Sequence, residues 1–378
     1  MKIKKERNME KEKERRIAIV KCRSYNQKEV DRAIKKALKL LEFDKKKYKK
    51  ILIKPNIVGG YGENQEAITT HPSLVRAVIK ELDGKKFIGE SSFSDTENSL
   101  KKAGYSDFKN IVIFENSKLV KIHNAHGKIL KSFYISKKVR NSDLVVNMPK
   151  LKTHTLTKMT GAIKNLYGCI SGGMKQVFHK KARGDERFSN LLVDIYQSIK
   201  PELNIMDAVI SMEGEGPSAG KPKKVGLILA SRNAVALDIA CARLMGYKSE
   251  EILAVKEAVE RGLYPNYKVE VVGELKEIPN LKFIRPTMQK KRFLKGLLVR
   301  LVREDPIVVD KEKCTKCRKC WKICPMKAIE MKPYPFIDKK KCIRCFCCIE
   351  VCPQHALHLQ ETLARKIYKM MKERRRKK

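Results

Sequence analysis

Eight cysteines in two identical blocks are the residues of this chain whose types and spacing most directly predict chemistry. Both blocks follow the pattern C-x2-C-x2-C-x3-C-P. Thiolates spaced in this way bind a cubane of iron and sulfide, and the fourth cysteine of each run reaches across to the other cluster. The pattern therefore predicts two [4Fe-4S] clusters, with the ligands Cys314, Cys317, Cys320 and Cys324 followed by Pro325, and Cys342, Cys345, Cys348 and Cys352 followed by Pro353.

The two blocks are an internal repeat. The interval from Cys314 to Cys342 recurs for every ligand, and Val309-Asp310 before the first block matches Ile337-Asp338 before the second. A duplicated half-domain explains this register. With the fourth ligands crossed, we expect one cluster on Cys314, Cys317, Cys320 and Cys352, and the other on Cys342, Cys345, Cys348 and Cys324.

Structural zinc is the alternative for paired C-x2-C motifs in a reducing compartment. The three-cysteine run and the proline after the fourth cysteine are instead typical of bacterial ferredoxins, and residues 306–360 resemble a two-cluster domain of that type. Cys347 is an alternative ligand beside Cys348, although the register selects Cys348. The remaining cysteines have no disulfide-like spacing, so we expect reduced thiols at Cys22, Cys169 and Cys241.

The charge of the chain is strongly basic, with 84 Lys and Arg against 42 Asp and Glu and a formal net charge of +42. Such a surface favours nucleic acid, anionic lipid, acidic proteins or anionic small molecules, and it does not choose among them. A Lys-rich and Glu-rich thermophilic surface is a further contribution to consider, although it leaves the shortage of acidic residues unexplained.

The chain divides into five predicted segments: a charged N-terminal tail (1–16), an α/β domain (17–284), a basic amphipathic linker helix (285–304), a two-cluster ferredoxin domain (305–360) and a basic C-terminal tail (361–378). The linker helix either packs on one of the domains or contacts an anionic membrane surface. Because no apolar run is long enough to span a membrane and the N-terminus is charged throughout, we expect a cytoplasmic protein.

Residues 17–284 alternate short apolar runs with amphipathic segments, which is typical of an α/β fold. Helical spacing appears at 30–41 and 74–82, with Pro72 in a first turn and Gly104 at a helix end. The pattern predicts a parallel or mixed sheet with helices on both faces. The predicted strands are 17–20, 51–53, 87–88, 111–114, 144–146, 204–206 and 225–229.

Polar residues gather after the predicted strands, where ligands bind in open α/β sheets. We expect these side chains to form an anion site, from Lys54, Asn56, Lys150, Lys152, Lys164, Asn165 and Lys175. His154 or His179 could transfer protons near neutral pH. Glu213, near Asp207 in a glycine-containing segment, is a candidate metal ligand or general base, and Asp238, inside an apolar helix, needs a partner such as a lysine.

Five motifs of this region resemble the family called domain of unknown function 362. They are Lys54-Pro55-Asn56, Thr70-His71-Pro72, Pro149-Lys150-Leu151-Lys152-Thr153-His154, Lys164-Asn165-Leu166-Tyr167-Gly168 and Met212-Glu213-Gly214-Glu215-Gly216-Pro217. The resemblance covers about residues 17–275 and implies an iron-sulfur center protein whose α/β domain is followed by a ferredoxin domain. The family supplies no settled activity and no catalytic residues to transfer.

Three functions remain open from the sequence. In the first, the clusters deliver electrons to an anionic substrate or cofactor held by the α/β domain, which would make the chain a ferredoxin-type oxidoreductase. In the second, the chain is an electron-transfer adaptor that docks on a separate, acidic redox enzyme. In the third, it is a nucleic-acid-binding iron-sulfur protein, against which few aromatics accompany the basic runs.

Overall fold

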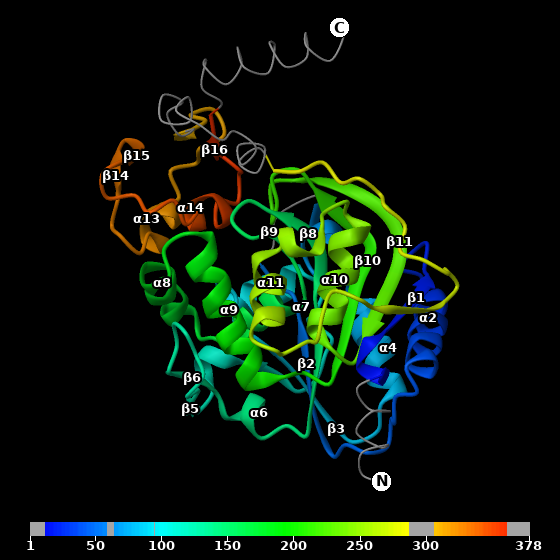
Figure 1. The fold of residues 1–378 in the computed structure, drawn as a ribbon. Coiled ribbons are helices and arrows are strands. Elements are labelled where there is room, and N and C mark those ends of the chain that lie inside the picture. The colour runs from blue at the N-terminus through cyan, green and yellow to red at the C-terminus, as the bar shows by residue number, and fades with distance from the viewer. Residues whose placement is uncertain (1–11, 59–63, 94, 287–305, 361–378) are drawn as a thin grey trace, which may run out of the picture.

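A computed structural model describes residues 12–58, 64–93, 95–286 and 306–360 (Figure 1). The predicted C-terminal tail lies outside these residues, as do most of the predicted N-terminal tail and of the linker helix. None of the helices in the described ranges combines the length and apolarity that crossing a membrane requires.

The large domain is built on a mixed sheet of ten strands in the described residues. All seven predicted strands are present. The spatial order is β12 (Glu270–Gly273), β1 (Arg16–Lys21), β11 (Lys221–Ser231), β10 (Leu203–Glu213), β7 (Leu144–Met148), β2 (Lys50–Pro55), β3 (Lys85–Glu90) and β4 (Ile111–Ile113), with β8 (Lys150–His154) paired to β10 and β9 (Lys158–Thr160) paired to β8.

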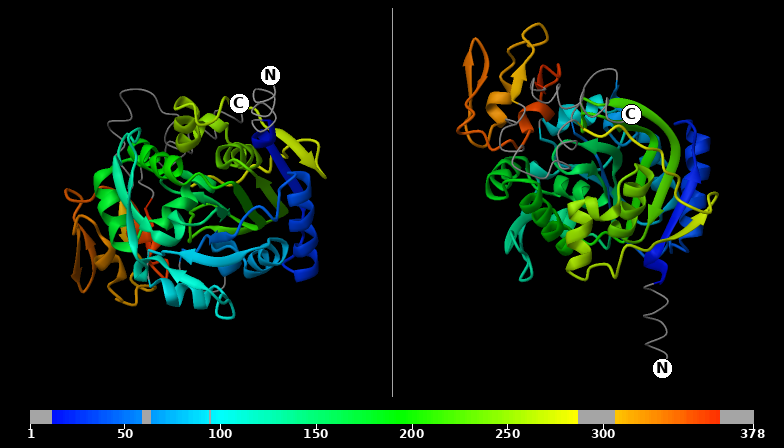
Figure 2. Two further views of the ribbon diagram at one scale, coloured as in Figure 1. Left: turned by 90° about the horizontal axis from the view of Figure 1, so that it is seen from below. Right: turned by 45° about the horizontal axis from the view of Figure 1, so that its top comes forward.

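Helices cover both faces of this sheet, as predicted (Figures 1 and 2). Successive side chains of β1 point to opposite faces of the sheet, and both faces are buried: Ile17 and Ile19 pack into one core, while Ala18 and Val20 pack into the other. The first core includes residues of α7 (Ala162–Asn165), α9 (Asp185–Ile199), α10 (Ala234–Leu244) and α11 (Leu253–Glu260). The second includes residues of α2 (Gln27–Leu40), α4 (Pro72–Glu81) and α5 (Thr96–Lys102).

The helix ends follow their sequence signals. Pro72 occupies the first turn of α4, and the His71 ring accepts a hydrogen bond from the Ser73 amide. Gly104 has φ +80°, the left-handed conformation that suits glycine directly after α5. The other elements of the large domain are α3 (Gln65–Ile68), the hairpin β5 (Leu119–His123) and β6 (Ser132–Ser136), α6 (Lys137–Arg140) and α8 (Gly172–Lys181).

Strands β7, β2 and β3 are parallel neighbours whose carboxyl ends meet at one edge of the sheet. Ile53 lies opposite Val146 on one side and opposite Ile88 on the other. The residues just beyond these positions therefore lie side by side. The segment after β7 is not a loop: Lys150–His154 forms β8, which is buried at all five positions.

The cysteine repeat folds as a small α+β domain with internal symmetry. Strand β13 (Ile307–Val309) pairs with β16 (Leu357–Leu359), and β14 (Ile329–Lys332) pairs with β15 (Tyr334–Ile337). The helices are α13 (Lys319–Ile323) and α14 (Cys347–Glu350). Left-handed backbone conformations recur at the sequence interval of the cysteines, in the pairs Lys316 and Arg344, Arg318 and Phe346, and Lys327 and His355. The repeat therefore extends to the backbone.

The small domain packs on the large one through α13 and α14, close to α8 (Figures 1 and 2). Ile323, Cys347 and Val351 form a buried apolar cluster against Phe93 of the large domain. The Ser218 hydroxyl donates to the carbonyl of Glu350 at 3.5 Å. The second half of the cysteine repeat thus faces the carboxyl ends of the sheet strands.

Candidate functional site

Four of the predicted cluster ligands surround one apolar cavity of about 20 Å³ in the small domain: Cys324, Cys342, Cys345 and Cys348. The other four also lie together. The pKa of the Cys320 thiol is raised to about 11, mainly by burial and in addition by the neighbouring Cys352, Cys317 and Cys314. The fourth cysteine of each block therefore lies with the first three of the other block.

The donor set of these cysteines fits iron-sulfur clusters. Backbone amides donate to the cysteine sulfurs, from Ala328 to Cys324 at 3.2 Å and from Ala356 to Cys352 at 3.3 Å. Such N–H···S bonds stabilise cluster-bound thiolates. Each iron of a cubane takes one thiolate, so the ligands stand apart; in the described ranges no three His, Cys, Asp or Glu side chains converge on a single metal ion.

Cys347 lines the same cavity as Cys348, and it also takes part in the contact between the two domains. Its side chain is buried against Ile323 and Val351 at the contact between the two domains. Contact with Cys345 and burial raise the pKa of the Cys347 thiol well above its ordinary value. Cys347 thus lies between the predicted cluster ligands and the large domain.

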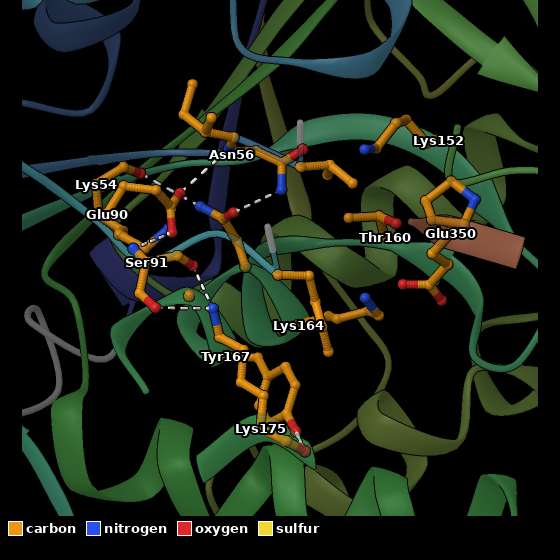
Figure 3. Close-up of a pocket in the computed structure, with 16 residues that line it drawn as sticks. Lys54, Asn56, Glu90, Ser91, Lys152, Thr160, Lys164, Tyr167, Lys175 and Glu350 are labelled. Carbon is orange, nitrogen blue, oxygen red and sulfur yellow. Dashed lines mark hydrogen bonds and ion pairs between the residues drawn. The ribbon is translucent and has the colours of Figure 1, made fainter. Parts of the chain in front are cut away.

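A cavity of about 50 Å³ lies at the carboxyl ends of the sheet strands, between the two domains (Figure 3). We call it the strand-end pocket. Its polar lining comes from β2, β3 and the residues that follow them, from β8, β9, α7, the 3-10 helix η3 (Leu166–Cys169) and α8, and, in the small domain, from α14. The polar side chains are those of Lys54, Asn56, Glu90, Ser91, Lys152, Thr160, Lys164, Asn165, Tyr167, Lys175 and Glu350.

A buried ion pair forms one wall of the strand-end pocket. The Lys54 ammonium donates to Glu90 Oε2 at 2.6 Å, and both side chains are almost completely buried. Burial raises the pKa of Glu90, against the opposing effect of Lys54 and Lys175. The backbone of Gly168 passes directly over the pair, because a Cβ there would lie 2.4 Å from Glu90 Oε1. A larger residue at this close approach would require the Lys54 and Glu90 side chains to shift.

Lys175 extends this wall from α8. Its ammonium donates to the carbonyl and to the hydroxyl of Ser91, and the Ser91 hydroxyl donates to Glu115 at 2.7 Å. Burial lowers the pKa of Lys175 to about 8, because Glu90 and Glu115 offset only part of the desolvation. The charge of this lysine therefore changes within a mildly alkaline pH range.

A chain of four asparagines leads from the core to the strand-end pocket. The amide group of Asn56 donates to Asn165 Oδ1 at 3.1 Å, Asn165 donates to Asn147 Oδ1 at 2.8 Å, and Asn147 donates to Asn204 Oδ1 at 2.9 Å. The amide dipoles are aligned head to tail and polarise one another. Asn56 Oδ1 is the last acceptor, and it has no hydrogen-bond partner in the described structure.

The wall from the small domain is the carboxylate of Glu350. Its Oε1 lies 3.2 Å from His154 Nε2, while His154 Nδ1 accepts from the amides of Leu156 and Thr157. The imidazole is therefore the tautomer that carries its proton on Nε2. Burial lowers the pKa of His154 to about 4, so the ring is neutral at pH 7. Burial opposes ionisation of Glu350, but contacts with His154 and the charge of Lys164 lower its pKa to about 2.

Two further lysines line the strand-end pocket, and they differ in the hydrogen bonds that their ammonium groups make. Lys152 is buried, donates to the Ile68 carbonyl at 2.7 Å, and has a pKa that burial and the charge of Lys164 lower well below the ordinary value. Burial also lowers the pKa of Lys164, and the charge of Glu350 opposes this effect. The Lys164 ammonium makes no hydrogen bond or ion pair with the described residues. Lys164 is only partly buried, and its ammonium is available for a further contact.

The structure separates Lys150 from the other predicted anion ligands. Its ammonium lies 2.8 Å from Asp207 and donates to the Tyr25 hydroxyl at 2.6 Å, and both charged side chains are fully buried. The Asp207 carboxylate also accepts from Tyr25 and from the His71 amide. The His71 ring stacks on Tyr25. This set, which we call the Lys150 cluster, consists of Lys150, Asp207, Tyr25 and His71, and it leaves the lysine fully paired.

The remaining predicted residues also lie outside the strand-end pocket. Glu213 pairs with Lys223 at 2.9 Å and accepts from the Ile284 amide, so it bridges strands. His179 is stacked on Phe188 among other aromatic rings. In contrast to the expectation, Asp238 pairs with no lysine of the described residues; it accepts from the amides of Ala162 and Ile163 at the start of α7. Burial raises its pKa to about 7.

Glu350 and Glu90 are the main residues of the strand-end pocket that sequence reasoning did not select. Glu90 follows a predicted strand, as the selected lysines do. Glu350 lies within the cysteine repeat, where its counterpart in the first block is Lys322. This reversal of charge at equivalent positions of the repeat is a sequence signal that could have identified Glu350.

Comparisons with known proteins agree with the two-domain organisation. The family model for domain of unknown function 362 matches residues 51–243, and a 4Fe-4S dicluster domain matches residues 306–353. A thylakoid-associated protein of Synechocystis sp. is 33% identical over 226 residues, which are 57% of this chain and 69% of that protein.

Two solved structures are similar over part of their length. A protein from Thermotoga maritima has a TM-score of 0.37 at 15% identity, with 59% of each chain covered. The lactate racemase apoprotein from Thermoanaerobacterium thermosaccharolyticum has a TM-score of 0.39 at 14% identity, with 66% of this chain and 58% of that one covered. Likeness at these scores supports no inference about this chain. From its sequence matches, the protein belongs to the family of domain of unknown function 362 and carries a C-terminal ferredoxin-type 4Fe-4S domain.

Proposed function

We propose that the protein binds two [4Fe-4S] clusters and delivers their electrons to an anionic substrate or cofactor held in the strand-end pocket. Bound clusters of this type supply one-electron transfer. The crossed arrangement of the eight cysteines supports the number of clusters, because each set of four lies together. The main observation in favour of the pocket as the acceptor site is that both domains line it. Glu350, from the helix that also contains Cys348, lines a cavity otherwise formed by the large domain.

The charges of the strand-end pocket favour an anion. Four lysines and two carboxylates line it, and Lys164 makes no ion pair with the described residues. A cavity of about 50 Å³ has room for a few water-sized groups, so it suits a carboxylate, a phosphate or another small anionic group. Pockets that hold a whole cofactor such as a flavin are larger, roughly 300–1,000 Å³. The pocket would bind a small anion or the charged end of a larger molecule.

The residues between the pocket and the predicted cluster ligands support electron transfer from a cluster to the pocket. Cys347, Glu350 and Cys345 all raise the pKa of Tyr167, after the dominant effect of burial, which places these groups near one another. Phe93 packs on Cys347 and also lines the pocket. An acceptor in the pocket would thus lie on the side of the small domain that presents Cys345.

Anaerobic reconstitution tests both parts of the proposal. We expect about eight iron atoms per chain, four for each cluster. Small anions should then alter the electron paramagnetic resonance signal of the reduced clusters, and Lys164→Met should weaken that response. Lys121→Met, at an exposed position on β5, is the matched control for loss of one positive charge. About four irons would contradict the cluster number, and an equal response in both variants would contradict the pocket.

A surface groove favours a second function, docking on a separate redox protein. The groove has a volume of about 680 Å³, and its lining includes Lys180, Lys322, Lys327, Val177 and Trp321; none of the described residues that line it is acidic. Trp321 is 49% exposed and Val177 is 52% exposed. The ligand Cys324 lines the same groove. Basic residues around an exposed aromatic suit an acidic partner.

Charge reversal separates this adaptor function from the first proposal. Lys322→Glu combined with Lys327→Glu should slow reduction of the clusters by an acidic electron-transfer protein and remove most of the salt dependence of that rate. The anion response of the reduced clusters should remain. Unchanged reduction kinetics in the double variant would exclude the groove as the docking site.

A further inference from the structure

The orientation of the asparagine chain carries information about the ligand of the strand-end pocket. Backbone carbonyls accept hydrogen bonds only, so they determine which end of a neighbouring amide is the NH2 group. Asn165 Nδ2 faces the carbonyl of Lys54 at 3.2 Å, and Asn147 Nδ2 faces the carbonyl of Ala162 at 2.9 Å. Both amides are therefore fixed without reference to Asn56.

The fixed orientation of Asn165 also fixes Asn56. Because Asn165 presents Oδ1 to Asn56, the nitrogen of Asn56 must point toward Asn165, and Asn56 Oδ1 must point away from it. That oxygen is buried, lines the strand-end pocket, and has no partner in the described structure. At the end of a polarised chain it is a strong acceptor, and leaving it unpaired is costly.

A second buried polar atom lines the same cavity. Thr160 Oγ1 also has no hydrogen-bond partner among the described residues, and the Thr160 side chain is almost completely buried. Figure 3 shows Asn56, Thr160, Lys152 and Lys164 arranged around a common space. The pocket thus offers ammonium donors for an anion and, on the side of Asn56, an acceptor that an anion without a proton would meet with repulsion.

We propose that the strand-end pocket selects anions that also carry an O–H or N–H donor, such as a hydrogen phosphate or a hydroxycarboxylate, over fully deprotonated anions of the same shape. This inference rests on the proposed anion pocket. The lysines would bind the negative oxygens, and Asn56 Oδ1 would accept the remaining proton of the ligand. Loss of that hydrogen bond leaves the acceptor unpaired, which is how buried sites reject close analogues.

Two matched pairs of probes test the selection on the reconstituted full chain at constant ionic strength. Inorganic phosphate and sulfate have the same shape, and near pH 8 the same charge, but only phosphate retains a proton. Glycolate and acetate differ by one hydroxyl group. We expect phosphate to bind at least about tenfold more tightly than sulfate, or glycolate more tightly than acetate by the same factor, in titration calorimetry. A difference between phosphate and sulfate would indicate a phosphate-like ligand, and a difference between glycolate and acetate would indicate a hydroxycarboxylate.

Substitutions test whether the selection between anions depends on Asn56 Oδ1 and Thr160 Oγ1. Asn56→Ala should reduce the ratio of affinities within the selective pair to about one, whereas Lys164→Met should weaken both members and keep the ratio. Thr160→Val, which is nearly isosteric, should lower the ratio without disturbing the asparagine chain, so the test stands even if Asn56→Ala does not fold.

The outcomes separate this inference from the proposed function. Equal binding within both pairs, weakened by Lys164→Met, would overturn the selection and leave the anion pocket intact. Absence of binding by all four probes would overturn the pocket itself, and with it the selection. Selective binding that persists in both Asn56→Ala and Thr160→Val would overturn the assignment of the selection to these atoms.

Discussion

The strand-end pocket and the Lys150 cluster are built from the same materials, buried lysines and carboxylates near the ends of sheet strands, but they differ in completeness. In the Lys150 cluster, the ammonium has a carboxylate at 2.8 Å and a tyrosine hydroxyl at 2.6 Å. In the strand-end pocket, Lys164 lacks a partner among the described residues, and the lining contains the unpaired oxygens of Asn56 and Thr160. The paired Lys150 stabilises the fold, whereas the partly buried Lys164 is available for the anion that we propose.

The largest effect on stability should come from removing a charged partner in the Lys150 cluster. Asp207→Asn leaves the buried ammonium of Lys150 without a countercharge, and we expect it to lower the free energy of unfolding by about 3–5 kcal/mol. Urea denaturation of the reconstituted protein measures this. Glu213→Gln is the control, because its ion pair with Lys223 is partly exposed and should contribute about 1 kcal/mol or less. Equal losses in the two variants would contradict the structural role of the Lys150 cluster.

A smaller loss should follow from crowding the wall of the strand-end pocket. In Gly168→Ala the new methyl group would meet Glu90 Oε1 and the Lys54 ammonium at about 2.5 Å or less. We expect a loss of about 1–3 kcal/mol in unfolding free energy, as for other overpacked sites. Iron content should be unchanged, because the substitution lies outside the small domain. Wild-type stability in Gly168→Ala would show that the Lys54 and Glu90 pair can move freely.

Removing the unpaired lysine should change binding far more than stability. Lys164→Met should weaken phosphate binding about tenfold, which corresponds to about 1.4 kcal/mol. The free energy of unfolding should change by no more than about 0.5 kcal/mol, since no ion pair with a described residue is lost and the lost attraction to Glu350 is offset by removal of the desolvation cost of Lys164. Calorimetric titration and urea denaturation of the same samples test both statements. A large loss of stability without a loss of affinity would make Lys164 equivalent to Lys150.

The smallest expected effect is a pH dependence from Lys175. Burial lowers its pKa from 10.5 to about 8, while Glu90 and Glu115 raise it and Lys54 lowers it further. As pH rises through 8 the ammonium loses its proton, so phosphate affinity should fall, by about threefold. The unfolded chain keeps this proton up to higher pH, and the same shift should raise stability between pH 8 and 10.5. Lys175→Met should remove both trends, and their persistence would assign them to another group.

The grouping of the eight repeat cysteines could be predicted from the sequence because it depends on fixed spacings. A fixed spacing of cysteines specifies which thiolates converge, and the repeat specifies the crossing of Cys324 and Cys352. The strands were predicted for the same reason, since alternating apolar runs report burial directly. β8 was missed because its residues Lys150, Lys152 and His154 are polar although they are buried.

The pocket could be predicted only in part, because its pairing depends on contacts distant in sequence. Lys150 and Lys152 lie two residues apart on one strand, yet only Lys150 meets Asp207. The register of β8 on β10 shifts between these positions, and no sequence pattern reports that shift. Glu350 reaches the pocket only through the packing of the small domain on the large one.

The most direct test of the central claim is the magnetic coupling between a reduced cluster and an anion in the strand-end pocket. In pulsed electron-nuclear double resonance of the reduced, reconstituted protein, with free phosphate near the dissociation constant of the unsubstituted protein, we expect a phosphorus coupling that is lost or strongly reduced in Lys164→Met and remains in Lys121→Met. Such a coupling would place the bound anion beside the cluster of the second cysteine block. Its absence, with both clusters reduced and phosphate bound, would contradict the proposal that the two domains share this site.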